Sequence, residues 1–257
     1  MNYTLITGAS NGIGAALARR CAQEGDNLIL VARNQQALEE LAEELESKHE
    51  IVVRVIAKDL LSPGAANDLY LLCQKNEWPV RVLINNAGVG LWGKFHELSL
   101  EQMLEMMQLN QQLIVELSHF FLPMLKEVPY AHILNVSSTA GFQPIPYFSV
   151  YAASKNFVLS FSRSLRQELK PLRINVSCLC PGPTESSFFE KAGFERIKYS
   201  KGAIMKAEEV ADEAILGMID RAAVIIPGFS NRVGAFFSKI MPSGLMASLI
   251  GKYFKPT

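Results

Sequence analysis

The chain has 257 residues, of which 49% are hydrophobic, and its 25 basic and 25 acidic residues leave no net charge. It is long enough to bury a full core, and its neutral balance offers no electrostatic footprint for a polyanion, which argues against a nucleic-acid partner. No linker-like composition, charge run, internal repeat or low-complexity segment divides it. We therefore expect one domain over residues 1–257 rather than two small ones.

The N-terminal residues and the cysteines both favour a cytoplasmic protein. The first residues, MNYTLITG, lack the basic start and the long apolar run of a signal peptide, so we do not expect secretion. Cys21, Cys73, Cys178 and Cys180 show neither C-x-x-C spacing nor a nearby histidine, and the four histidines are scattered. We expect reduced thiols, with Cys178 and Cys180 packed on one face of a strand, and no metal site.

Short apolar runs rich in β-branched residues alternate with stretches of helical period along the whole chain. The runs predict seven strands, over residues 3–7, 27–32, 51–57, 80–84, 132–137, 174–179 and 223–226. Their near-continuous hydrophobicity is typical of a parallel sheet covered on both faces, and residues 34–48 show the leucine spacing of an intervening helix. We therefore expect an α/β fold, a single-domain Rossmann-like doubly wound parallel sheet flanked by helices, with its ligands beyond the carboxyl ends of the strands.

The first predicted strand ends in a glycine-rich stretch, TGASNGIG at residues 7–14, and a strong helix former follows it. Glycines allow a sharp turn and let backbone N–H groups approach a pyrophosphate at the positive end of the helix. The spacing G-x-x-x-G-x-G differs from the common G-x-G-x-x-G fingerprint, and a plain tight turn is the alternative. The position between a strand and a helix favours a dinucleotide site.

The second predicted strand ends at Ala32-Arg33. Sites that prefer NAD usually have an acidic residue here for the ribose 2′-hydroxyl, whereas an arginine accommodates the 2′-phosphate of NADP. Arg33 could also simply begin a solvated helix face. With the glycine motif upstream, we favour NADP(H) as the cofactor.

A serine, a tyrosine and a lysine follow the fifth predicted strand. Tyr151 and Lys155 are four residues apart, hence on one face of a helix that begins near Val150, and Ser138 closes the preceding strand. A tyrosine can protonate the alkoxide that forms when hydride reaches a ketone carbon, and we expect the Lys155 ammonium and a nicotinamide ring to lower its pKa. Ser138 would polarise the carbonyl oxygen. The alternative is a half-buried ring beside a solvated lysine.

Together these motifs resemble the short-chain dehydrogenases/reductases. The resemblance spans almost the whole chain and rests on the joint order of TGASNGIG, Asp59, the NNAG motif at residues 85–88, Asn110, Ser138, Tyr151, Lys155, Pro181 and Gly182. Ala32 stands where NAD-preferring members carry aspartate, and Asn11 where some NADP-preferring members are basic, so the NADP preference rests mainly on Arg33.

The resemblance also implies roles for individual residues. Asn110, Ser138, Tyr151 and Lys155 would form the catalytic set, with Asn110 linking Lys155 to solvent through a water. The implied cofactor contacts are Gly8, Ser10, Asn11, Gly12, Ile13 and Gly14 at the phosphates and ribose, Asp59 and Leu60 at the adenine, Asn86, Ala87 and Gly88 along the sheet, Tyr151 and Lys155, and Pro181, Gly182 and Thr184 at the nicotinamide.

The C-terminal third carries the substrate prediction. Residues 183–222 are expected to form a lid, and Phe188, Phe189, Phe194 and Tyr199 indicate an apolar or amphipathic carbonyl substrate unless they only close the lid on the core. Residues 229–257 form an apolar extension with no acidic residue, four basic ones, and a proline and glycines that make it a poor membrane span.

Three interpretations of this extension compete: a packed helix or dimer contact, an entrance flap over a lipid-like substrate, and a membrane-surface helix. We favour the first of them and expect no strong binding to lipid vesicles.

These patterns favour an NADP(H)-dependent oxidoreductase of the short-chain type, acting between a carbonyl and a secondary alcohol. One alternative is a catalytically silent NADP-sensing protein, against which the complete catalytic set argues. Another is an epimerase or dehydratase on the same fold, which would consume no net NADPH. The resemblance implies a homo-oligomer, dimer or tetramer, with a small-molecule substrate.

Overall fold

A seven-stranded sheet, parallel throughout, forms the centre of the computed structural model, which describes residues 2–186, 188, 192–193 and 204–256. The strands lie in the order β3-β2-β1-β4-β5-β6-β7. Their bounds are β1 Tyr3–Thr7, β2 Asn27–Ala32, β3 Val53–Ala57, β4 Val80–Asn85, β5 His132–Val136, β6 Asn175–Leu179 and β7 Val224–Ile225. All seven predicted strands are confirmed, with β3, β5, β6 and β7 shorter than expected. The strand order reverses between β1 and β4, and this reversal opens a crevice where such folds bind ligands.

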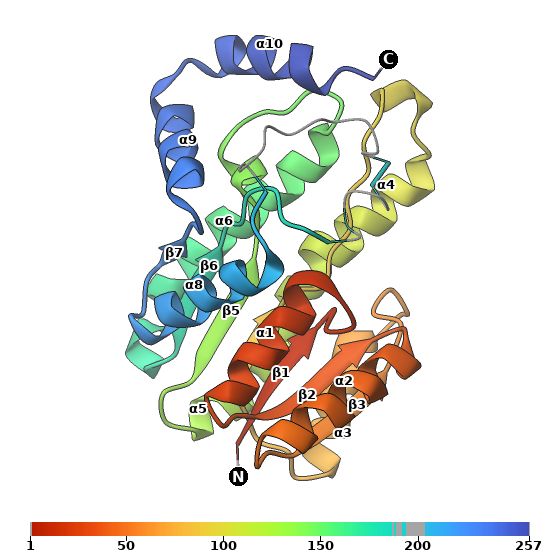
Figure 1. The fold of residues 1–257 in the computed structure, drawn as a ribbon, viewed down its shortest axis with the longest axis vertical. Coiled ribbons are helices and arrows are strands. Elements are labelled where there is room, and N and C mark those ends of the chain that lie inside the picture. Colours follow the sequence, from red (N-terminus) through yellow and green to blue (C-terminus); the bar gives the residue numbers. More distant parts are fainter. Residues whose placement is uncertain (1, 187, 189–191, 194–203, 257) are drawn as a thin grey trace.

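Helices cover both faces of the sheet, and Figure 1 shows the two layers. On one face lie α1 (Gly12–Gln23), α2 (Gln35–Lys48) and α8 (Ala207–Ile219). On the other lie α3 (Ala65–Lys75), α5 (Leu113–Glu127) and α6 (Ser149–Leu169). Successive strand residues supply the two cores in turn, because side chains alternate along a strand: Ile6 packs under the first layer and Leu5 under the second. The near-continuous apolar runs of the sequence are explained by burial on both sides.

The remaining elements lie at the carboxyl ends of the strands, except for the turn Lys170–Leu172, which precedes the start of β6. They are the short 3₁₀ turns Phe95–Glu97, Thr139–Phe142 and Lys170–Leu172, the helix α4 (Leu100–Met107), the π-helical segment Gln108–Gln112, and the helices α9 (Phe229–Ile240) and α10 (Ser243–Phe254). In Figure 1, α9 and α10 lie at the opposite end of the molecule from the N-terminus. Within the described residues, no helix combines the length and the apolar character needed to cross a membrane.

The helix α8 occupies part of the segment predicted to form a lid, residues 183–222. Val210, Ala211 and Ala214 of α8 are fully buried, and α8 packs closely against α1. Residues 207–219 therefore belong to a main helix layer and do not cover the crevice. Of the lid aromatics, Phe188 is described, whereas Phe189, Phe194 and Tyr199 lie outside the described residues.

The buried imidazole of His132 makes the folding stability depend on pH. It is buried on β5, where its Nε2 lies 2.9 Å from the Ser177 hydroxyl oxygen, and burial lowers its pKa to about 4 from the usual 6.5. Between these two values the unfolded chain binds more protons than the folded one, so acidification from pH 6.5 to 4 should cost about 3 kcal/mol. Urea denaturation at pH 7 and pH 4.5 measures this loss.

The variant His132→Gln is expected to flatten this pH dependence, even if it lowers stability at neutral pH. His119→Gln on the exposed side of α5 is the matched control and should keep the wild-type slope. An unchanged slope in His132→Gln would show that other groups cause the acid sensitivity.

Candidate active site

A cavity of about 730 Å³ lies beyond the carboxyl ends of the strands, at the β1/β4 reversal. It runs from Arg33 and Asp59 at one end to Phe188 and Phe254 at the other. Every residue predicted to contact a cofactor lines it, as do Ser138, Tyr151 and Lys155, whereas Asn110 does not. The fold thus brings residues from positions 8 to 254 of the chain to one site.

The glycine-rich turn connects β1 to α1 with very little space around its backbone. Gly8 and Gly12 have φ values of +67° and +54°, in the left-handed region that suits glycine. A Cβ on Gly14 would lie 2.2 Å from the Gly8 carbonyl oxygen, which is far too close for any side chain. Asn11 precedes α1 without capping it through its side chain, so the first N–H groups of α1 are not satisfied by that route.

Two side chains lock the turn to the end of β4. The Asn86 amide nitrogen donates to the carbonyl oxygens of Thr7 at 2.9 Å and Gly8 at 3.1 Å. The Thr7 hydroxyl accepts from the backbone N–H groups of Asn86 and Ala87. These bonds fix two neighbouring strand ends relative to each other, which makes the turn a rigid cradle with room for a ligand but not for a Cβ.

The end of the cavity beside β2 and β3 is lined by the charged side chains of Arg33, Lys58 and Asp59. Arg33 is exposed there and forms no ion pair with any of the described residues. Lys58 also lines this end, with its ammonium 3.0 Å from the Asp68 carboxylate. Lys58 was missed in the sequence because a single lysine after a strand has no distinctive spacing. An unpaired guanidinium at this position suits a phosphate group.

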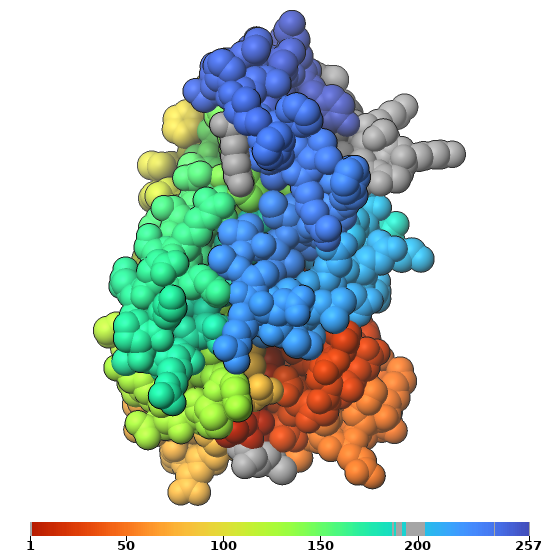
Figure 2. All heavy atoms as spheres, turned by 90° about the vertical axis from the view of Figure 1, so that its left-hand side faces the viewer, coloured from red at the N-terminus to blue at the C-terminus, as the bar shows by residue number. Residues whose placement is uncertain are grey.

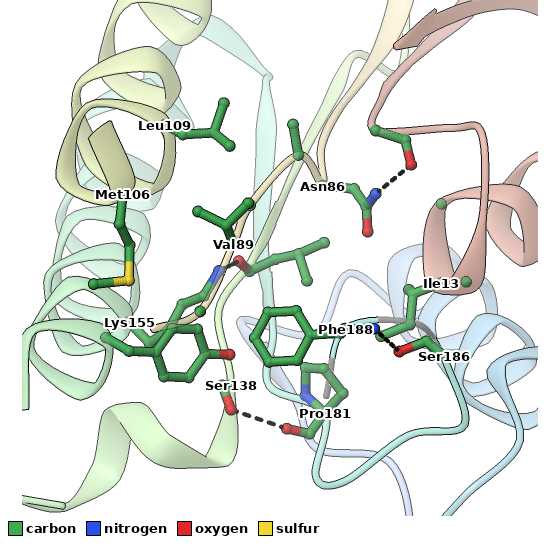
Figure 3. A pocket seen from close by; sticks show the side chains of 18 of the residues that line it. Ile13, Asn86, Val89, Met106, Leu109, Ser138, Lys155, Pro181, Ser186 and Phe188 are labelled. Atoms are coloured by element: carbon green, nitrogen blue, oxygen red, sulfur yellow. Dashed lines mark hydrogen bonds between the residues drawn. The ribbon is translucent and has the colours of Figure 1, made fainter. Parts of the chain in front are cut away.

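Ser138, Tyr151 and Lys155 all line the cavity. Figure 3 shows Ser138 and Lys155 among the lining side chains. Tyr151 and Lys155 lie one turn apart on α6, and both are buried, with 6% and 4% of their surface exposed. The Ser138 hydroxyl accepts from the Ala140 N–H and lies 3.4 Å from the Pro181 carbonyl oxygen, and its influence on the Tyr151 phenol lowers the pKa of that group. The three side chains therefore line one cavity, and their catalytic roles stay a prediction.

Burial shifts the pKa of both residues on α6. It raises the pKa of Tyr151 to about 12, with the Ser138 hydrogen bond opposing it, and lowers the pKa of Lys155 to about 8. The Lys155 ammonium donates to the Val136 carbonyl oxygen at 3.0 Å and lies 5.7 Å from the centre of the tyrosine ring. In the protein by itself, desolvation of the phenolate decides the direction of the tyrosine shift. The expectation that Lys155 and a nicotinamide ring together lower this pKa stays a prediction.

Asn110 is fully buried in the π-helical segment between α4 and α5. Its amide closes a pair of hydrogen bonds with the backbone of Val89, at 3.0 Å and 2.9 Å, and donates to the Ser154 hydroxyl. A Cβ on Gly88 would lie 3.0 Å from the Asn110 amide oxygen and 3.3 Å from the Lys155 ammonium nitrogen. Asn110 therefore holds the loop after β4 close to Lys155. Its part in a water-mediated proton relay stays a prediction.

The far end of the cavity is apolar. The rings of Phe148 and Tyr151 stack with their centres 4.1 Å apart, and the Phe188 ring lies 5.5 Å from that of Tyr151. Met106, Leu91, Ile145 and Phe254 complete this part of the lining, and Gln143 adds a polar group. Except for Tyr151 and Phe188, the sequence did not single these residues out, because they come from loops and helix ends that converge only in the folded chain.

The segment after β6 forms another wall of the cavity. Pro181, Gly182 and Thr184 line it, and the Thr184 hydroxyl donates to the Gly182 carbonyl oxygen at 3.0 Å. A Cβ on Gly182 would lie 2.2 Å from the amide oxygen of Asn231, so α9 packs directly on this segment. The described residues hold no cluster of side chains suited to a metal ion, and all four cysteines are buried and free.

Comparisons with known proteins show the family of the chain. The family model described as short chain dehydrogenase matches residues 2–196. The NADP-dependent 3-hydroxy acid dehydrogenase YdfG of Escherichia coli K12 is 32% identical over 213 residues, which cover 82% of this chain and 82% of that protein.

Two solved structures share the fold over almost the whole chain. A short-chain dehydrogenase from Sphingobium yanoikuyae in complex with NADPH is 31% identical, with a TM-score of 0.84 and coverage of 96% of this chain and 95% of that one. A bulky-bulky ketone specific alcohol dehydrogenase from Comamonas testosteroni is 29% identical, with a TM-score of 0.79 and coverage of 96% and 94%. The chain is an oxidoreductase by descent and belongs to the short-chain dehydrogenase family.

Proposed function

We propose that the protein is an NADP(H)-dependent oxidoreductase that interconverts a carbonyl compound and a secondary alcohol of apolar or amphipathic character. One observation carries the proposal: Ser138, Tyr151 and Lys155 stand between the glycine-lined cradle and the apolar end of a single cavity. A hydride donor at the one end and a ketone at the other would meet at these three side chains.

The residues of the cradle fit a dinucleotide. The Asn11 side chain does not cap the first N–H groups of α1, and Arg33 offers a guanidinium for a 2′-phosphate. Two relatives support this choice by their names, since one is NADP-dependent and another was solved with NADPH. When bound, NADPH would supply the hydride.

The chain's own side chains would manage the proton. Ser138 would donate a hydrogen bond to the carbonyl oxygen and hold it beside Tyr151, whose phenol would protonate that oxygen as it gains charge. With a pKa raised to about 12, Tyr151 is protonated at neutral pH, as a proton donor must be. Lys155, held by the Val136 carbonyl, would place its ammonium beside the phenolate that remains.

The apolar end of the cavity supports the substrate class. Phe148, Phe188, Met106, Ile145 and Phe254 present rings and alkyl groups to the reacting centre. The relative from Comamonas testosteroni, whose title names bulky ketones, is consistent with such a substrate. We also propose that the described part of the predicted lid before α8 covers the cavity. A cytoplasmic location and a homo-oligomeric assembly are further parts of this proposal.

The deciding experiment is oxidation of NADPH and NADH by the purified protein against ketones, aldehydes and 3-oxoacyl thioesters. Turnover with NADPH on an apolar ketone supports the proposal. Tight NADPH binding without turnover would favour the sensor. Conversion of a substrate without net NADPH consumption would favour an epimerase or dehydratase.

Arg33→Ser is expected to raise the KM for NADPH by about tenfold to a hundredfold, because a hydrogen bond between charged groups contributes about 1.5–3 kcal/mol. The KM for NADH should change little, since NADH has no 2′-phosphate. Steady-state kinetics with both cofactors measures the difference. Lys75→Ser, at an exposed position of α3 away from the cavity, is the control and should leave both values unchanged. Equal losses with NADPH and NADH would show that Arg33 does not read the 2′-phosphate.

A further inference from the structure

The helix α9 exposes its apolar face. Phe229, Val233, Phe236, Phe237 and Ile240 recur at helical spacing, so all five lie on one side of the helix. Their exposed fractions run from 37% for Val233 to 80% for Phe229. A surface helix usually turns such a stripe toward the core, so this arrangement is the reverse of the common one.

The side chains on the inner face of α9 are small or polar, which explains why the apolar stripe faces outward. Ala235 is buried, with 4% of its surface exposed, and Ser238 donates to the Ala235 carbonyl oxygen. Asn231 donates to the Pro227 carbonyl oxygen at 2.8 Å and lies against Gly182. This side chain fits the tight space beside Gly182. The apolar stripe is therefore left on the outside by the packing itself.

The helix α10 continues the exposed apolar surface. Its inner side chains Met246, Ile250 and Phe254 pack toward the cavity end of the molecule, and the Trp92 ring nitrogen donates to the Phe254 carbonyl oxygen at 2.9 Å. Leu245 and Leu249 face outward, with 53% and 51% exposed. Figure 2 shows α9 and α10 in blue, at the surface of the upper part of the molecule.

The charge of this surface is positive. Residues 229–257 contain four basic residues and no acidic one. Arg232 is neutralised by an ion pair with Glu213 of α8, whereas Lys252 and Lys255 are exposed and form no ion pair with any described residue. Exposed aromatic and aliphatic side chains beside unpaired lysines are the pattern of helices that lie in the interface of an anionic bilayer.

We propose that the outer face of α9, continued by Leu245 and Leu249 of α10, binds the surface of an anionic lipid bilayer. Charge complementarity favours this occupant over a second copy of the chain, because two copies would bring the same acid-free, lysine-bearing segment together. The proposal reverses the expectation from the sequence of no strong vesicle binding. The reason is that the sequence could not show which side of α9 packs against Gly182. Binding is peripheral and leaves the proposed catalytic reaction unchanged.

Co-sedimentation of the full-length protein with vesicles tests the proposal. Binding is expected to vesicles of equal parts phosphatidylcholine and phosphatidylglycerol, to fall with added salt, and to be weak with pure phosphatidylcholine. The double variant Phe236→Glu/Phe237→Glu should bind the anionic vesicles at least about tenfold more weakly, since it loses two large apolar groups and gains two repelled charges. Lys252→Gln/Lys255→Gln should also bind more weakly.

The control is Leu216→Glu on α8, outside the proposed face. Leu216 is 54% exposed and Phe237 is 55% exposed, so the two positions are matched in exposure. It should bind vesicles like the wild type, and NADPH binding by all variants checks that the fold survives. Wild-type protein that fails to bind, or a double variant that binds as well as wild type, would overturn the proposal. A second result would also overturn it: light scattering that finds a dimer in the wild type and in every variant except the double variant. The apolar face of α9 would then be the contact with a second copy of the chain.

Discussion

Tyr151→Phe is expected to lower kcat for carbonyl reduction by a factor of about 100 to 10,000, the range that a positioned proton donor contributes. The substitution removes the phenol hydroxyl and keeps the ring that stacks on Phe148 and lies beside Phe188. Burial already keeps this phenol protonated, so it can act as the proton donor at neutral pH. Stopped-flow measurement of NADPH oxidation separates this chemical step from binding.

The affinity for NADPH should change little in the same variant, as measured by the quenching of protein fluorescence. Tyr147→Phe is the matched control, because Tyr147 precedes α6 and does not line the cavity. It should retain the wild-type rate. If Tyr151→Phe also kept a rate within about a factor of two, the proton would have to come from another group, and the proposed role of Tyr151 would be wrong.

Gly14→Ala is expected to destabilise the fold by about 1–3 kcal/mol or more and to abolish NADPH binding. The new Cβ would lie 2.2 Å from the Gly8 carbonyl oxygen and 2.5 Å from the Asn86 amide nitrogen. Relief of either contact requires α1 to move away from the turn, which breaks the bonds that Asn86 makes to Thr7 and Gly8. Urea denaturation with and without NADPH measures both effects.

Gly234→Ala provides the control for this prediction. Gly234 also lies in a helix, but a Cβ there would meet no atom within 4 Å. The substitution should stabilise the protein by about 0.5–1 kcal/mol, the difference in helix propensity between the two residues. A Gly14→Ala protein with wild-type stability and NADPH affinity would mean that the turn adapts and that the cradle is not rigid.

Several features could be predicted because they depend on local patterns. The strands were found from their apolar runs, and even the short β7 was located to within one residue at each end. The pairing of Tyr151 with Lys155 follows from the helical repeat alone. The pKa of Tyr151 could not be predicted in the same way, because the balance between desolvation and nearby charge depends on how deeply α6 is buried.

The sequence by itself determined the seven strands, the glycine turn, the acid-free C-terminal segment and the spacing of Tyr151 and Lys155, because each depends on neighbours a few residues apart. Only the tertiary structure decided the apolar lining of the cavity, the bonds between Asn110 and Val89, and the outward turn of the apolar stripe on α9. Each of these depends on contacts between distant segments. In α9 the close fit of Asn231 against Gly182 selects which face is buried, and hydrophobic periodicity carries no information about that fit.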